Sequence, residues 1–129
     1  MRAATETTMV KVMLVEDHPD FRRLVARLVE REPDLEVVAQ AGSLEEARRY
    51  AASVMCDVAV LDMSLPDGSG ADLIAELREL CPGSAALILS ATLDPASLAR
   101  AREAGAEEVL DKLAAPAEVI EAIRRLANR

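Results

Sequence analysis

Two acidic residues interrupt the chain immediately after its first apolar run. Residues 13–21 read MLVEDHPDF, so three apolar side chains lead directly into Glu16, Asp17 and His18. Adjacent carboxylates repel each other, and at the end of a strand they also lose hydration. Either both carboxylates point into water or a positive group lies between them. His18 is the only histidine, and the proline that follows it favours a solvated turn position.

Three other apolar runs also end in polar residues. Asp62 ends the run DVAVLD, Ser90 ends AALILS, and Lys112 ends EVLDK. The interiors of these runs consist almost entirely of aliphatic residues, so the polar groups occupy set positions. A chance origin is plausible for one strand end and much less so for four.

The apolar runs alternate with segments of helical periodicity. Such alternation predicts a parallel sheet with helices on both faces. Right-handed crossovers then bring the carboxyl ends of all strands to one edge, where sites form in open α/β sheets. The predicted strands are Val10–Val15, Leu35–Ala41, 57–62, Ala85–Ser90 and 108–112. Three predicted helices begin near Pro19, Ser43 and Pro95. Two more are indicated by apolar residues at helical spacing: Leu73, Ile74, Leu77 and Leu80 in one, and Val119, Ile120, Ile123 and Leu126 in the other.

The polar groups at that edge suit phosphoryl transfer. Glu16, Asp17 and Asp62 cannot all stay ionised within a few ångströms without a counter-ion. Mg²⁺ is a hard cation that prefers carboxylate, water and phosphate oxygens. The ammonium of Lys112 and the hydroxyl of Ser90 can each bind a phosphoryl oxygen. Asp62 lies between these groups and is the expected nucleophile, because a carboxylate can accept a phosphoryl group as an acyl phosphate.

Composition narrows the class of protein. With 129 residues and 51% hydrophobic residues, the chain can bury the core of one domain. A formal net charge of −8 argues against binding nucleic acid through clustered cations, and no apolar run is long enough to span a membrane. We expect a disordered tail over residues 1–9 and a single domain over residues 10–129, in the cytoplasm, with no output domain. Cys56 and Cys81 are expected to be buried fillers.

Four motifs carry a resemblance to a known family. They are LVEDHP (residues 14–19), VAVLDMSLPDGSG (58–70), LILSA (87–91) and GAEEVLDK (105–112). In order and spacing they resemble the receiver domain of bacterial two-component response regulators, also called CheY-like, over about residues 10–127. The nearest subfamily is the one that often carries a LuxR-type helix-turn-helix output. The resemblance implies a flavodoxin-like (βα)5 fold with strand order 2-1-3-4-5.

The resemblance also implies roles for individual residues. Asp62 would be the phosphoacceptor, and Ser90 and Lys112 would bind the phosphoryl group. Mg²⁺ would be held by Asp17 and Asp62, by Glu16 directly or through water, and by the backbone carbonyl of Ser64.

The implied partner is a sensor histidine kinase or a phosphotransfer protein, and the resemblance allows a homodimer on phosphorylation. No contact with nucleic acid or membrane is expected of this domain. The chain would be no enzyme beyond catalysing its own phosphorylation and dephosphorylation.

One departure from the family leaves an alternative open. Val109 occupies the position where the family commonly has Tyr or Phe, a ring that turns inward on phosphorylation. Valine cannot provide that movement. A phosphorylation-independent interaction module with the same fold is therefore the alternative, although the intact acidic, Ser and Lys set argues against it.

Overall fold

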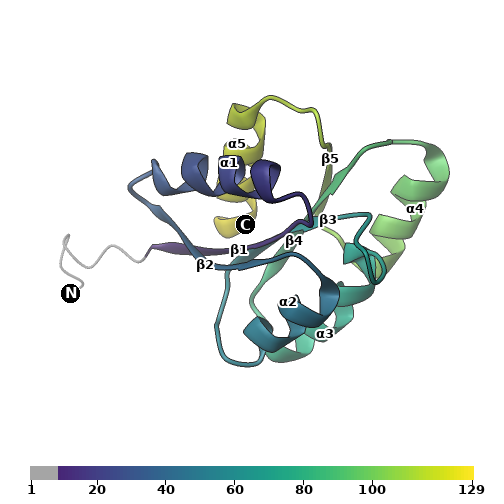
Figure 1. Cartoon of the computed structure of the whole chain (residues 1–129), viewed down its shortest axis with the longest axis horizontal. Helices are drawn as coiled ribbons and strands as arrows, with labels where there is room; N and C mark the ends of the chain where they lie inside the picture. Colours follow the sequence, from purple (N-terminus) through teal and green to yellow (C-terminus); the bar gives the residue numbers. More distant parts are fainter. Residues whose placement is uncertain (1–8) are drawn as a thin grey trace.

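A twisted parallel sheet forms the centre of the molecule (Figure 1). The structure is a computed structural model that describes residues 9–129. Its strands follow the order β2-β1-β3-β4-β5, which confirms the predicted topology. The expected tail lies outside the described residues except for Met9. The strands are β1 (Val10–Val15), β2 (Leu35–Ala41), β3 (Val58–Asp62), β4 (Ala85–Ser90) and β5 (Glu108–Asp111).

Helices cover both faces of the sheet. In Figure 1, α1 (Pro19–Glu30) and α5 (Pro116–Ala127) lie together on one face. The other face carries α2 (Leu44–Ala51), α3 (Ile74–Leu80) and α4 (Pro95–Ala104). A short 3₁₀ turn, η1 (Gly70–Leu73), precedes α3 and was not predicted as a separate element. Among the described residues, no helix combines the length and apolar character that crossing a membrane requires.

The sheet separates two aliphatic cores. The core beneath α1 and α5 contains residues such as Val12, Val60 and Ile123, and the core beneath α2, α3 and α4 contains Met13, Leu61 and Ile88. Alternate residues of one strand point to opposite faces, so β1 and β3 serve both cores. Strands buried on both faces read as continuous apolar runs, which is the pattern of the sequence.

Cys56 and Cys81 are both free and buried in the α2–α3–α4 core, as expected. Burial raises the pKa of the Cys56 thiol to about 12. The thiol therefore packs as a neutral, unreactive group at physiological pH.

Local signals in the sequence set most helix ends. Proline occupies the first turn of α1, α4 and α5, where its missing N–H is not needed. The side chain of Asp94 accepts a hydrogen bond from the Ser97 backbone N–H at the start of α4. Gly105 ends that helix with a φ of 105°, a left-handed conformation that favours glycine.

Candidate functional site

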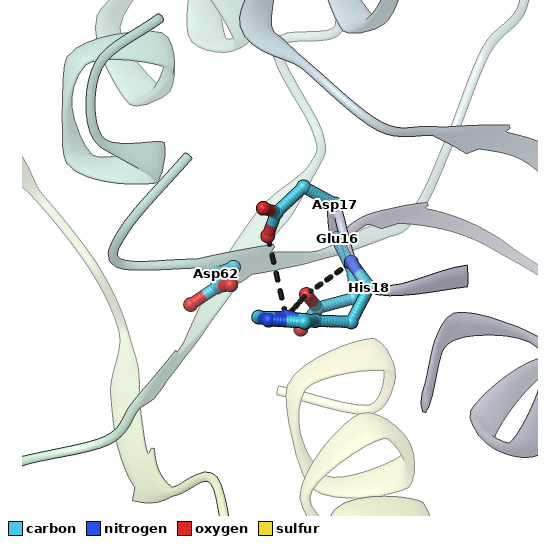
Figure 2. Close-up of side chains that lie close together, drawn as sticks. All are labelled: Glu16, Asp17, His18 and Asp62. Carbon is cyan, nitrogen blue, oxygen red and sulfur yellow. Dashed lines mark hydrogen bonds and ion pairs between the residues drawn. The ribbon is translucent and has the colours of Figure 1, made fainter. Parts of the chain in front are cut away.

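The carboxyl ends of β1 and β3 bring acidic side chains together. Ligand-capable atoms of Glu16, Asp17, His18 and Asp62 all lie within 4.8 Å of one another (Figure 2). Glu16 and Asp62 are each only 5% exposed, whereas Asp17 lies at the rim. The convergence predicted from the alternation of strands and helices is therefore present for all three carboxylates.

Lys112 supplies the positive charge nearest to the buried acids. β5 ends at Asp111, so Lys112 lies one residue beyond the strand in which it was expected. Its Nζ donates to Asp62 Oδ2 at 3.0 Å and forms an ion pair with Glu16 Oε1 at 2.7 Å. The same ammonium lies 5.2 Å from the centre of the Phe21 ring, a cation–π distance. One lysine thus neutralises part of the charge of two buried carboxylates.

Burial and the shared lysine shift the proton affinities of this group in different directions. Burial raises the pKa of Asp62, and the charge of Glu16 adds to that rise, while Lys112 and the Ser64 N–H only partly offset it. Burial would also raise the pKa of Glu16, but Lys112 and the hydrogen bonds from His18 outweigh it, so this pKa is lowered. Burial would lower the pKa of Lys112, but Glu16 and Asp62 outweigh it, so this pKa is raised. Glu16 is therefore the more firmly ionised acid of the pair.

Two buried carboxylate oxygens remain without a hydrogen-bond donor. They are Asp17 Oδ1, which lies 3.4 Å from His18 Nδ1, and Glu16 Oε1, which has no hydrogen bond but forms an ion pair with Lys112 Nζ at 2.7 Å. A buried charged oxygen without a partner is unfavourable. A hard divalent cation bound by carboxylate oxygens would satisfy Asp17 and Asp62 together, so the residues present fit Mg²⁺.

His18 joins the acidic cluster more closely than the sequence indicated. It is largely exposed, as a turn residue would be, and it caps the start of α1. Its backbone N–H donates to Glu16 Oε2 at 2.9 Å, and its Nδ1 lies 2.8 Å from the same oxygen. Glu16 is therefore engaged on both oxygens, by Lys112 and by His18. This arrangement favours an indirect role for Glu16 at a metal.

Ser64 and Ser90 line the same open cleft as Asp62 and Lys112, a space of about 590 Å³. The Ser64 backbone N–H donates to Asp62 Oδ1 at 3.2 Å, which orients the carboxylate. The Ser90 hydroxyl does not contact Asp62 but donates to the Thr92 carbonyl at 2.6 Å. Ser90 must therefore turn before it can bind a group on Asp62.

Two residues near the site were not predicted from the sequence. Phe21, which lies beside the Lys112 ammonium, has the spacing of an ordinary core residue of α1. Thr92, the partner of Ser90, lies in a loop that carries no motif. No signal in the sequence separates Phe21 from an ordinary core residue. Thr92 could have been predicted near the site, because it lies two residues after the end of a strand.

The sequence is similar to known signalling proteins. The model of the response regulator receiver domain family matches residues 12–124. The transcriptional regulatory protein UhpA of Salmonella typhimurium is 38% identical over 120 residues, covering 93% of this chain and 60% of UhpA. This chain therefore spans little more than half the length of that curated relative.

Solved structures show the same likeness. The signal receiver domain of NarL from Mycobacterium tuberculosis superposes with a TM-score of 0.87 at 30% identity, covering 94% of this chain and 98% of that domain. A response regulator from Burkholderia pseudomallei has a TM-score of 0.82 at 28% identity, covering 92% of this chain and 69% of that protein. That protein was solved with a phosphorylated aspartic acid, a calcium ion and citrate.

Proposed function

The chain belongs to the family of response regulator receiver domains, and from that premise we propose that it is a switch operated by phosphorylation of Asp62. A sensor histidine kinase or a phosphotransfer protein donates the phosphoryl group, and Mg²⁺ is the cofactor. The domain works in the cytoplasm and controls the output of a transcriptional regulator such as UhpA. It transforms no separate substrate and catalyses only its own phosphorylation and dephosphorylation.

The described residues suit each step of this reaction. Asp17, Asp62 and the Ser64 carbonyl would hold Mg²⁺, with Glu16 acting directly or through water, and the bound ion would offset negative charge on the phosphoryl oxygens. A carboxylate oxygen of Asp62 forms the new O–P bond while the N–P bond of the phosphohistidine breaks. Lys112 Nζ, which is 3.0 Å from Asp62 Oδ2, then pairs with a phosphoryl oxygen.

The change at Asp62 reaches α4 through the segment that follows β4. Ser90 turns from the Thr92 carbonyl to a phosphoryl oxygen, so the 2.6 Å hydrogen bond between them is lost. Thr92 Oγ1 accepts from the Asp94 backbone N–H at 3.3 Å, and Asp94 caps α4 through the Ser97 N–H at 2.7 Å. Release of Thr92 therefore shifts the start of α4. This route does not need the aromatic ring that Val109 replaces.

One observation carries the proposal: Asp62 is buried beside a lysine, while Asp17 Oδ1 faces the same space without a donor. The ion pair with Lys112 involves Asp62 and Glu16 and leaves Asp17 Oδ1 without a donor. A phosphoacceptor with an adjoining metal site accounts for both features.

The test uses a small phosphodonor and intact-protein mass spectrometry. Incubation with acetyl phosphate and Mg²⁺ is expected to add one phosphoryl group to the wild-type chain. The gain should disappear with a chelator and in Asp62→Asn. An equal gain in Asp62→Asn would contradict the assignment of the phosphoacceptor.

The alternative function, a binding module that does not need phosphorylation, rests on Val109. This residue is only half-buried and packs against the α2–α3–α4 core. Absence of a mass gain with acetyl phosphate and with a phosphorylated histidine donor would favour this alternative.

A further inference from the structure

The first turn of α2 is capped by an acidic residue from a distant loop. Asp67, in the loop between β3 and η1, accepts hydrogen bonds from the Leu44 backbone N–H at 2.8 Å and from the Glu45 backbone N–H at 3.1 Å. The two segments are 22 and 23 residues apart in the chain. The contact therefore joins the loop that follows the phosphoacceptor to a helix that contributes no side chain to the cleft.

Asp67 completes the hydrogen bonding of the α2 N-terminus. The first backbone N–H groups of a helix have no partner within the helix. The Ser43 hydroxyl accepts from the Glu46 N–H at 3.1 Å, and the Ser43 carbonyl accepts from the Ala47 N–H at 3.0 Å. The backbone N–H groups of Leu44 and Glu45 remain, and the Asp67 carboxylate accepts a hydrogen bond from each. Its negative charge also faces the positive end of the helix dipole.

These two hydrogen bonds hold Asp67 in its ionised form. The N–H groups of Leu44 and Glu45 stabilise the carboxylate and keep the pKa of Asp67 below its usual value. Asp67 is therefore an anion throughout the pH range in which a phosphoryl group would be transferred.

The loop between Asp67 and the site is short and internally bonded. The Leu65 N–H donates to the Gly68 carbonyl at 2.8 Å, and the Gly68 N–H donates back to the Leu65 carbonyl at 3.3 Å. Gly68 has a φ of 147°, and a Cβ there would lie 2.7 Å from Leu44 Cδ1. This turn therefore packs directly on the first residue of α2. Ser64 immediately precedes the turn, and its N–H is bonded to Asp62.

We propose that Asp67 is a positioning residue for the metal site, because it links the turn that follows Ser64 to the N-terminus of α2. The inference rests on the proposed function, in which the Ser64 carbonyl is a ligand of Mg²⁺. Without the two hydrogen bonds between Asp67 and α2, the turn keeps its internal hydrogen bonds but loses its orientation relative to β3. The carbonyl then has to be ordered when the cation binds, which lowers affinity.

This link must act in both directions, since coupling between two sites is reciprocal. If α2 orders the Ser64 loop for Mg²⁺, then Mg²⁺ must order the α2 N-terminus. The Leu44 and Glu45 amide hydrogens should therefore exchange more slowly with solvent when Mg²⁺ is added. A cap that only stabilised α2 would show no such dependence on the cation.

Ser43→Ala is the matched control for Asp67→Ala. Both variants remove a cap from the same helix end, but only Asp67 connects that end to the site. We expect both to lower the thermal stability of the protein. Asp67→Ala alone should weaken Mg²⁺ binding, by about tenfold or more, the effect typical of losing a residue that orients a metal ligand. Asp67→Asn keeps one carbonyl oxygen, which can accept a hydrogen bond from one of the two N–H groups. Its Mg²⁺ affinity should therefore lie between those of the wild type and Asp67→Ala. This variant also provides the test if Asp67→Ala does not fold.

Calorimetric titration with Mg²⁺ and hydrogen exchange of the full chain provide the readouts. Slower exchange at Leu44 and Glu45 with Mg²⁺ in the wild type and in Ser43→Ala, together with weaker binding by the Asp67 variants, would support the inference. Equal Mg²⁺ affinity in the wild type and the folded Asp67 variants would overturn it while leaving the proposed function intact. Failure of the wild type to bind Mg²⁺ would overturn the proposed function and this inference with it.

Discussion

The negative charge of Asp62 lowers the stability of the folded protein when no cation is bound beside it. Asp62 and Glu16 are both buried and share one ammonium, from Lys112. Burial and the charge of Glu16 raise the pKa of Asp62, which means that the folded state favours its neutral form. The proposed phosphoacceptor is therefore a group that destabilises the metal-free fold.

Removal of this charge should stabilise the metal-free protein. A carboxylate whose pKa is raised in the folded state contributes stability below its unfolded pKa, near 3.8, and that contribution is lost as pH rises through the folded pKa. At neutral pH, we expect Asp62→Asn to increase the free energy of unfolding, because Lys112 keeps Glu16 as its partner and no buried cation is left unpaired. The increase should shrink as pH falls toward 3.8.

Urea unfolding of both proteins with a chelator present measures this difference. Added Mg²⁺ should stabilise the wild type more than Asp62→Asn, because a ligand that binds only the folded state raises stability. A wild type that is more stable than Asp62→Asn at neutral pH without Mg²⁺ would contradict the account.

At the residue scale, position in the fold was more informative than side-chain type. Glu16, Asp17, Asp62 and Lys112 were predicted to meet because each lies at or next to a strand end, and the structure brings them together. The contact of His18 with Glu16 could not be predicted in the same way. It depends on the direction of one imidazole ring at the start of α1.

The elements β3 and η1 approach each other closely beside the site. A Cβ on Gly70 would lie 2.5 Å from the Asp62 carbonyl oxygen and 2.8 Å from Leu61 Cβ. Neither neighbour is the flexible end of a side chain, so η1 would have to move away from the end of β3. Gly70 is therefore required for the close approach rather than for an unusual φ.

Gly70→Ala should destabilise the protein by about 1–3 kcal/mol, the usual cost of overpacking. It should also slow phosphorylation by acetyl phosphate, because the displaced backbone of η1 packs directly against Asp62. The control is Gly83→Ala, since a Cβ at Gly83 meets nothing within 4 Å. Denaturant unfolding of both variants is the measurement. Equal stabilities for the two variants would show that the junction yields easily and that the contact is unimportant.

Element boundaries were predictable where the pattern was strong. Strands Val10–Val15, Leu35–Ala41 and Ala85–Ser90 were predicted with the bounds that the structure shows. The η1 turn was not, because its four residues are too few for a helical period to appear. The capping box that Ser69 and Asp72 form at the start of η1 was not predicted either. In the sequence, these two residues resemble those of an ordinary polar turn.

At the scale of the whole molecule, the parallel topology explains why the site forms. Strict alternation of strand and helix places every carboxyl end at one edge, and this much followed from hydrophobic patterning. Links between distant segments did not follow from it. The contact of Asp67 with α2 needs the three-dimensional path of a loop, which periodicity does not contain. The extent of the domain over residues 10–129 stays a prediction.

Titration of the wild-type chain with Mg²⁺, followed by the backbone amide NMR signals, shows whether a cation binds beside Asp62. We expect saturable shifts centred on residues 16, 17, 62 and 64, and a large loss of affinity in Asp17→Asn, because Asp17 Oδ1 is a buried carboxylate oxygen without a hydrogen-bond donor. The absence of shifts at these residues, or an undiminished affinity in Asp17→Asn, would contradict the proposed metal site.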